Sequence, residues 1–372
     1  MQAQTGGKSL DFVFEDLSFV KNNEYFNFIA DGYTLLGNKL YTGVRLQPHS
    51  DYDIRVGADW IKYYGLNNFS YIIPSISLHL DKGKHQFYFG RLDTGNNHDM
   101  PQQIFAFERL LDARSIENGL QHKYTGKRWQ SDTWLEWEHF IFKNDKDRER
   151  LNFGHHSDWH FPFSDNLEIQ IPVSLLLHHR GGQINRHDQP SPNNSAIVVA
   201  NFSSGLGFQY KLNQDTSLGI QYDFFVHSIN SDNTEDFVFK TGKAHLVTFK
   251  LDYQQFEGKF SFWQSRKYIA PKGDDMFQSL SRKTEIYFEN NEQATVFAGY
   301  AEPDRQLLYT SLSYHKEIAR DLHLGFVTEL YYQLNKVEIH TPAYSGVIQN
   351  HFDYSMGLYV QYRLQSRLIH FR

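Results

Sequence analysis

Apolar and polar residues alternate with a period of two along most of this chain. In the clearest stretch, residues 166–179, the apolar positions are Leu167, Ile169, Ile171, Val173, Leu175 and Leu177, and the polar ones between them are Glu168, Gln170, Ser174 and His178. Successive side chains of a strand point to opposite faces, so this stretch has one apolar and one polar face. The same register recurs at 218–227, 322–333 and 356–363. Many such strands of about ten residues, each able to cross a bilayer when tilted, predict a transmembrane β-barrel.

The segments between the alternating stretches fall into two length classes that follow one another along the chain. Short connections are expected at 48–50, 82–84, 164–166, 213–215 and 290–292, and long ones at 93–116, 180–195, 229–239, 268–279 and 335–351. Outer-membrane barrels have tight turns on the periplasmic side and long loops outside. We therefore expect an all-β, single antiparallel barrel of about eighteen strands, with about sixteen as the alternative count. Both chain ends should lie on the side of the short turns.

The pattern predicts one domain without a linker, preceded by a short N-terminal segment. Residues 1–22 are polar and irregular, and we expect them to form a periplasmic lead-in or a plug. The barrel should then cover 23–372, with its first strand at 24–31 and two late strands at 280–289 and 294–300.

Composition agrees with a barrel and excludes other classes. The chain has 372 residues, of which 16% are aromatic, and no Cys. Its mean hydropathy of −0.57 is low, as expected when only every second residue of a strand faces lipid. The sequence contains no run of eighteen apolar residues, so we expect no transmembrane helix. The net charge of −6 argues against nucleic acid as a partner, because nucleic-acid sites are basic.

Four short segments carry a family resemblance. They are Ala-Asp-Gly-Tyr-Thr-Leu-Leu-Gly at 30–37, Phe-Gly-Arg-Leu at 89–92, Phe-Glu-Arg-Leu at 107–110 and Glu-Asn-Gly-Leu-Gln at 117–121. With the hairpin pattern of 24–372, they resemble the porin-like outer-membrane barrels of Bacteroidota. The resemblance implies that the third external loop, 93–116, folds into the barrel and narrows it. The chain ends on Phe371-Arg372, whereas porins commonly end on an aromatic residue.

The third external loop supplies the expected pore constriction. Its spacing over 102–114 suits a short helix with Ile104, Phe107, Leu110 and Leu111 on one face. Charged groups held over the pore would tune ion selectivity. The expected constriction residues are Arg91, Asp93, Asp99, Glu108, Arg109, Asp112 and Arg114. The alternative is a salt-bridge cluster on the outer surface.

The polar register predicts the residues that line the pore. They are Glu136, Glu138, Arg150, His156, Asp158, His160, Glu168, Asp223, Lys250, Glu257, Lys259, Glu329 and Arg363. Acidic and basic groups are mixed, which favours a weakly selective, water-filled channel. The alternative is a lattice of paired charges on the wall around a plugged lumen. Inward aromatic residues such as Trp134, Trp263 and Tyr331 would either bind sugars or pack against loops inside the barrel.

Sites of other kinds have weaker support. His156, Asp158 and His160 share one strand face, but their spacing is too wide for a metal site, and we expect no metal. Ser157 lies beside His156 and Asp158, yet neighbours on a strand face opposite ways and cannot form a catalytic triad. A hydrolase therefore ranks below a channel in this interpretation, and the chain is expected not to be an enzyme.

The sequence thus favours a porin-like channel in the outer membrane of a Gram-negative bacterium, without a cofactor. It would pass small hydrophilic solutes by diffusion. The alternative is a barrel subunit of a larger outer-membrane assembly with an occluded lumen. Expected partners are outer-membrane lipid, the solutes, and either further copies of the chain or other outer-membrane proteins.

Overall fold

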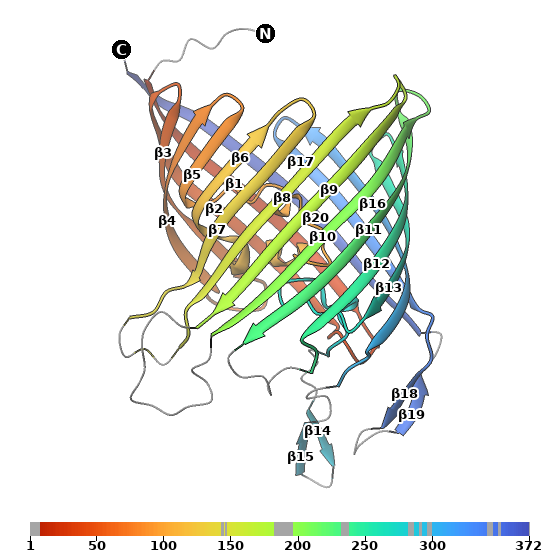
Figure 1. Cartoon of the computed structure of the whole chain (residues 1–372). Coiled ribbons are helices and arrows are strands. Elements are labelled where there is room, and N and C mark those ends of the chain that lie inside the picture. Colours follow the sequence, from red (N-terminus) through yellow and green to blue (C-terminus); the bar gives the residue numbers. More distant parts are fainter. Residues whose placement is uncertain are drawn as a thin grey trace.

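A computed structural model describes residues 8–142, 145, 147–181, 196–231, 238–281, 286–289, 292–295, 300–340, 345–348 and 351–371. Sixteen antiparallel strands close into one barrel (Figure 1). They are β1 (Lys8–Glu24), β2 (Tyr33–His49), β3 (Tyr52–Tyr63), β4 (Tyr71–Lys82), β5 (His85–Arg91), β6 (Asn118–Thr125), β7 (Trp129–His139), β8 (Arg150–Pro162), β9 (Leu167–Arg180), β10 (Ile197–Lys211), β11 (Thr216–Ser231), β12 (Thr241–Tyr253), β13 (Phe256–Arg266), β16 (Asp304–Ala319), β17 (Leu322–Gln333) and β20 (His351–Phe371). The expected closed barrel is confirmed, with the lower of the two strand counts.

Strand alternation divides the wall into two faces, as the sequence predicts. On β11, Asp223 and Phe225 are buried on the inner side, while Tyr222 between β10 and β12 remains 43% exposed on the outer side. Each strand pairs with its neighbours in sequence, and β1 pairs with β20 to close the ring. The start of β1 and the end of β20 lie at the end of the barrel that carries the short turns (Figure 1). Among the described residues, no helix is long and apolar enough to cross a membrane.

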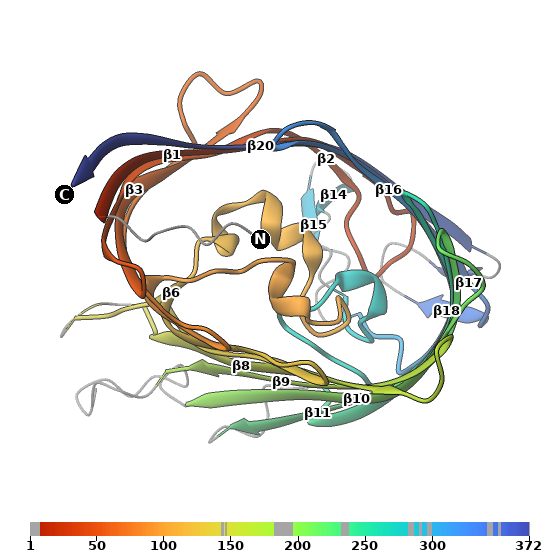
Figure 2. The same ribbon diagram turned by 90° about the horizontal axis from the view of Figure 1, so that it is seen from above.

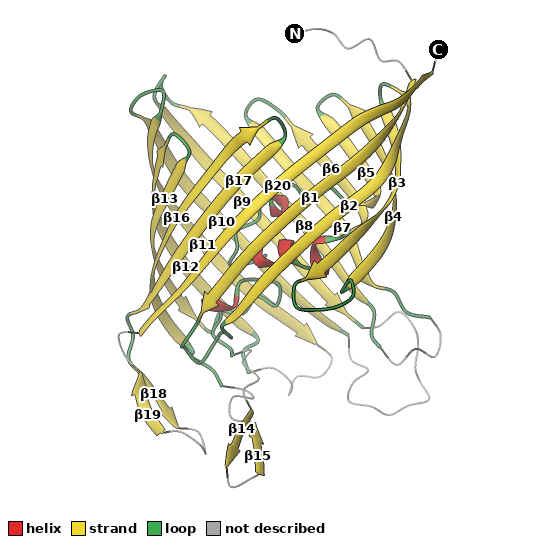
Figure 3. Ribbon diagram, turned by 180° about the vertical axis from the view of Figure 1, so that it is seen from behind, coloured by secondary structure: helices red, strands yellow, loops and turns green. Residues whose placement is uncertain are grey.

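Three sequence-based boundaries differ from the structure. Residues 8–22, expected in a lead-in or plug, belong to β1 in the barrel wall, and residues 25–31, expected in the first strand, form a loop. The expected barrel strands at 280–289 and 294–300 are instead represented by β14 (Ile286–Glu289) and β15 (Glu292–Thr295), a separate two-stranded sheet. A second small sheet pairs β18 (Val337–His340) with β19 (Ser345–Ile348). Both hairpins project from the long-loop end of the barrel (Figure 3).

Three segments from the long-loop end fold into the lumen, and we call them the inner plug: residues 25–32, 92–117 and 268–281 (Figure 2). The middle segment is the third external loop, which lies inside the barrel as expected. The single helix expected over 102–114 is replaced by short 3₁₀ turns at Phe107–Leu111 and Ala113–Ser115. Further turns of this kind lie at Asn97–Asp99 and Asp275–Phe277. Ile104 is fully buried, whereas Phe107, expected on the same packed face, is 42% exposed.

The apolar core of the protein lies between this plug and the barrel wall. The plug contributes Met100, Ile104, Phe105, Tyr268 and Phe277, and the wall contributes Trp134, Phe225, Trp263, Tyr309 and Tyr331. These inward aromatic residues therefore pack against inward loops, which was the second of the two roles expected for them. Trp134 lies directly over Gly154, where an added Cβ would come within 2.1 Å of the indole ring.

Arginine substitutions on the two faces of β9 should differ in their effect on stability. Val173→Arg places a cation against lipid and should destabilise the folded barrel by about 2–4 kcal/mol. Glu168→Arg, on the inner face of the same strand, should fold as the unmodified protein does. Urea titration of the vesicle-inserted barrel, followed by the gel shift between folded and unfolded forms, measures both. Equal destabilisation by the two variants would show that the faces are assigned wrongly.

Candidate functional site

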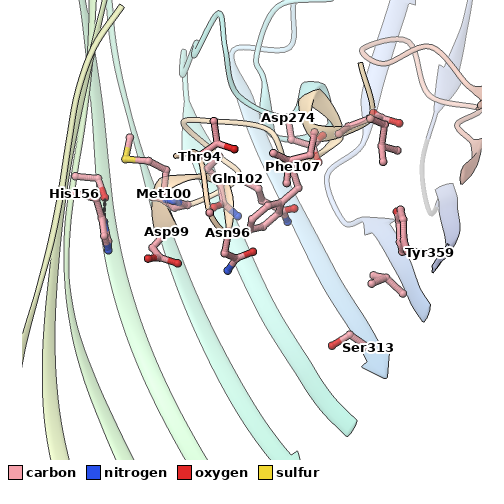
Figure 4. Close-up of a pocket in the computed structure, with 18 of the residues that line it drawn as sticks. Thr94, Asn96, Asp99, Met100, Gln102, Phe107, His156, Asp274, Ser313 and Tyr359 are labelled. Carbon is pink, nitrogen blue, oxygen red and sulfur yellow. Dashed lines mark hydrogen bonds between the residues drawn. The ribbon is translucent and has the colours of Figure 1, made fainter. Parts of the chain in front are cut away.

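Two cavities lie beside the inner plug among the described residues. The larger, which we call the chamber, has a volume of about 1220 Å³ and lies on the short-turn side of the plug (Figure 4). Its lining reaches Glu257, the second residue of β13 after the short turn from β12. The smaller, which we call the crevice, holds about 80 Å³ among the plug and the long-loop ends of β7 and β8. The lumen is thus neither filled nor freely open.

Chamber and crevice share three lining residues, one from each segment of the plug. These are Tyr25, Glu108 and Asp274, which we call the septum. The Glu108 carboxylate accepts a hydrogen bond of 2.7 Å from the side-chain amide of Asn23. Asp274 accepts one of 2.9 Å from the backbone N–H of Met276. The septum is therefore where the chamber and the crevice adjoin.

Burial changes the acidity of the septum carboxyls. Loss of hydration raises the pKa of Asp274 to about 8, and the negative charges of Glu329, Glu108 and Asp275 act in the same direction. Burial also raises the pKa of Glu108, although hydrogen bonds from Tyr33 and Asn23 and the charge of Lys21 oppose the effect. At neutral pH the septum therefore carries less negative charge than its two carboxyls would carry in water.

Buried polar contacts hold the plug to the wall. The His98 ring stacks on Trp134 with centroids 3.8 Å apart, and its two nitrogens lie 2.8 Å from Asp132 and 3.0 Å from Glu117. Burial lowers the pKa of His98, while the hydrogen bond to Asp132 opposes that shift. Glu117 also pairs with Arg109, whose guanidinium lies over the Phe105 ring at 4.0 Å. This cluster serves to fix the third loop rather than to expose reactive groups.

The structure brings most of the expected pore residues to the two cavities. The chamber is lined by Arg91, Asp93, Asp99, Glu108, His156, Asp158, Asp223, Lys250, Glu257, Lys259, Glu329 and Arg363. The crevice is lined by Glu108, Arg109, Arg114, Glu136 and Glu138. Neither cavity is lined by Asp112, Arg150, His160 or Glu168.

Many of these charges are paired across the wall. Arg91 donates two hydrogen bonds of 3.0 and 2.8 Å to Asp59, and Lys21 lies 3.0 Å from Glu329. Asp112 binds Arg114, and His160 lies 2.9 Å from Glu168 at the short-turn end of β8 and β9. On the chamber wall, Arg91–Asp59 and Lys21–Glu329 are thus paired charges of the kind that the sequence left open as an alternative.

One hydrogen-bonded chain on the chamber wall escaped the sequence analysis. His156 on β8 lies directly opposite Ser174 on β9, with 2.9 Å between Nδ1 and the serine Oγ. Its Nε2 lies 3.1 Å from the Asp158 carboxylate. Ser157, the serine whose position in the sequence drew attention, has a buried side chain with no hydrogen-bond partner. The sequence places Ser174 on the inner face of its strand. Its contact with His156 depends on the register between β8 and β9, which the sequence of one strand does not give.

A second hydrogen-bonded group lies on the outer face at the long-loop end, and we call it the rim cluster: Asn22, Glu24 and Thr34. Thr34 Oγ1 donates to Asn22 Oδ1 at 2.6 Å, and Asn22 Nδ2 donates to Glu24 Oε1 at 3.0 Å. On β1, Asn22 and Glu24 alternate with Lys21 and Asn23, which reach groups inside the barrel. Thr34 on β2 lies directly opposite Asn22. The rim cluster therefore faces the membrane interface rather than the lumen.

Polar groups continue from the rim cluster down the outer face of β1 and β2. Ser18 donates to Asp16 at 2.9 Å, and the Asn38 amide donates to Asp16 at 3.4 Å. The Tyr64 hydroxyl donates to Asn38. Polar side chains on an outer barrel wall are costly in hydrocarbon, and here they satisfy one another through these hydrogen bonds.

Solved structures of porins share the barrel fold. A loop L8 deletion mutant of OmpT from Vibrio cholerae has a TM-score of 0.51 at 10% identity, covering 96% of this chain and 100% of that one. The trimer form of OmpT scores 0.50 at 9% identity, with 96% and 100% covered. OpdL of Pseudomonas aeruginosa scores 0.50 at 10% identity, with 96% and 99% covered. These likenesses support the predicted porin resemblance for the fold and the predicted location in the outer membrane.

Sequence comparison gives the family. No curated protein matches the chain, but the family described as lipid A 3'-O-deacylase-type matches residues 2–371. A deacylase is a hydrolase. The sequence-based prediction that the chain is not an enzyme is therefore wrong.

The septum should make stability depend on pH. The pKa of Asp274 is 3.8 in the unfolded chain and about 8 in the folded protein. Protonated Asp274 therefore favours the folded state at low pH. This contribution to stability is lost as the pH rises through 8. The midpoint temperature of thermal unfolding should therefore decrease as the pH is raised from 5 to 9. Asp274→Asn should make this decrease smaller. Asp99→Asn, a chamber carboxyl exposed to water, is the matched control. An equal decrease in the midpoint temperature for the unmodified protein, Asp274→Asn and Asp99→Asn would contradict the raised pKa of Asp274.

Proposed function

The chain belongs to the lipid A 3'-O-deacylase-type family, and on this premise we propose that it hydrolyses an acyl ester of lipid A at the rim cluster. In this reaction water adds to the ester carbonyl and the acyl–oxygen bond breaks. The products are a free fatty acid and a sugar hydroxyl. The match over residues 2–371 is the observation that carries the proposal.

The position of the substrate selects the rim cluster over the lumen. An acylated glycolipid keeps its chains in the hydrocarbon layer, and its ester groups lie at the interface with water. A catalytic group that meets such an ester from the membrane must lie on the outer face near the long-loop end. Asn22, Glu24 and Thr34 meet this requirement, because they occupy the end of β1 and the start of β2. The chamber is separated from lipid by the barrel wall.

The rim cluster offers groups with suitable chemistry. Glu24 provides a carboxylate that can take a proton from water as it attacks the carbonyl. Asn22 orients that carboxylate at 3.0 Å and has a second amide N–H for the developing oxyanion. The exposed Thr34 hydroxyl fixes Asn22 from the other side at 2.6 Å. The polar wall around Asp16 and Asn38 would receive the sugar and its polar substituents.

A second function is supported by a separate observation, the chamber. Its volume of about 1220 Å³ and its mixed charges suit passage of small hydrophilic solutes, narrowed by the third loop at the septum. This is the diffusion role that the sequence favoured, and it is compatible with hydrolysis at the rim. Solutes would cross between chamber and crevice beside Tyr25, Glu108 and Asp274.

Partners follow from the same two roles. Lipid A would contact the outer wall at β1 and β2. Self-association is supported by the fold, since the similar OmpT was solved in a trimer form. The alternative of a subunit in a larger outer-membrane assembly would use the occluded lumen and the long loops.

Substitution of the rim base should abolish deacylation. Glu24→Gln keeps the side-chain size but removes the base, and the rate of acyl release should fall by about 100-fold or more. The measurement is mass spectrometry of lipid A after incubation with the folded protein, following the loss of one acyl chain.

Threonine variants provide the matched control. Thr34→Val should slow the same reaction, because Asn22 loses its donor. Thr42→Val removes another outward hydroxyl of β2, which accepts from Trp60 at 2.9 Å, and should leave the rate unchanged. Full activity of Glu24→Gln would disprove the rim site.

Single-channel recording tests solute passage. The unmodified protein in a planar bilayer should give stable open steps, and the reversal potential under a salt gradient reports ion preference. Tyr25→Ala shortens a septum side chain and should raise the conductance. Tyr88→Ala, which removes a ring from the chamber wall, should change it less. If neither the unmodified protein nor Tyr25→Ala conducts ions, a transport role would be contradicted.

A further inference from the structure

We propose that Ser174, His156 and Asp158 form a nucleophilic esterase site on the chamber wall, separate from the rim cluster. Its substrates would be short-chain acyl esters of hydrophilic alcohols, which enter from the short-turn end. The proposal does not rest on lipid A hydrolysis, because it uses other residues on the opposite side of the wall.

The geometry is that of a nucleophile, a base and an orienting acid. The serine Oγ lies 2.9 Å from His156 Nδ1, and the carboxylate of Asp158 lies 3.1 Å from Nε2. With the carboxylate accepting from Nε2–H, Nδ1 is left free to accept the proton of the serine hydroxyl. The roles match those of serine hydrolases, although the two ring nitrogens are exchanged.

The strands hold the three groups rigidly. β8 and β9 pair from Arg150 opposite Arg180 to Pro162 opposite Glu168, and the His156–Ser174 pair lies midway along this ladder. Asp158 follows His156 by two residues and so points to the same face. Ser174 is 1% exposed and His156 is 7% exposed. The side chains therefore stay in place without the mobility of a loop.

The chamber determines the class of substrate. All three residues line it, and Figure 4 shows His156 at its wall. The lining also contains Lys250, Asp223 and Lys259, and burying a long acyl chain among charges would remove their hydration without replacement. A small acyl group on a sugar or another polar alcohol fits both the volume and the polarity.

The reaction conserves atoms and protons. Ser174 Oγ bonds to the ester carbonyl carbon as its proton passes to His156 Nδ1. The bond between the carbonyl carbon and the alcohol oxygen breaks, and the alcohol leaves with that proton. Water then attacks the acyl-serine with His156 as base, which releases the carboxylic acid and restores the hydroxyl.

Covalent labelling of the full-length folded protein is the first test. Diisopropyl fluorophosphate should phosphorylate Ser174 with loss of fluoride, as read by peptide mass spectrometry, and the folded protein should hydrolyse p-nitrophenyl acetate. Ser174→Ala should reduce that hydrolysis to background, and His156→Gln should slow labelling by about 100-fold. Ser203→Ala is the control, because Ser203 lines the same chamber and pairs with Ser174 from β10. Absence of the adduct from Ser174, or equal labelling of Ser203, would overturn the proposal.

The absence of cysteine from the chain allows a second readout that does not require turnover. Ser174→Cys and Ser203→Cys each introduce a single thiol into the chamber. Because His156 would favour the thiolate at position 174, iodoacetamide should alkylate that variant about tenfold faster at neutral pH. Equal alkylation rates in two variants that both show the gel shift of the folded barrel would also overturn the proposal.

Discussion

Closure of the barrel is the constraint on which the rest of the structure depends. Hydrocarbon offers no hydrogen-bond partners, so every backbone group of a membrane-crossing sheet must be paired within the protein. The ladder between β1 and β20 meets this requirement by joining the two ends of the chain from Lys8–Phe371 to Glu24–Tyr354. The outer face can then be apolar and the inner face polar. This agrees with the alternation of apolar and polar residues in the sequence.

A ring of sixteen strands encloses more space than its own side chains fill. The inner plug occupies part of this space and brings its own apolar surface to that of Trp134, Phe225 and Trp263. Wall residues also hydrogen-bond to backbone groups of the plug. Arg305, for example, donates to the carbonyl groups of Met276 and Gln278 at 2.7 Å. The remaining space is the chamber, so its shape is set as much by loops as by strands.

The sequence predicted those features that depend on a period of two. The strands and the short and long connections could be read from single residues and lengths, whereas the inward third loop was implied by the family resemblance. β1 was missed because its faces are mixed: Val13 and Phe19 point inward, while Asp16 and Ser18 point outward. The extra strands at 280–300 were predicted because a β hairpin outside the barrel has the same composition as one within it.

The candidate sites were harder to predict because they join residues from different elements. The His156–Ser174 contact depends on the register between two strands. The rim cluster joins Asn22, which was assigned to a lead-in, to Glu24 and Thr34 from the expected barrel, and their contact depends on the register between β1 and β2. Alternation alone also gives no indication of hydrolysis, since a porin and a barrel hydrolase place apolar residues toward lipid for the same reason.

The anchor of the first loop has a consequence for assembly. The backbone N–H groups of Phe26 and Asn27 both donate to Asp353, which lies on β20. A loop that directly follows β1 is thus held by β20, the strand that pairs with β1 to close the ring. It follows that this part of the plug reaches its native place only after the ring has closed. The interior is completed late, and an unfinished barrel in the membrane would have a wider passage than the finished one.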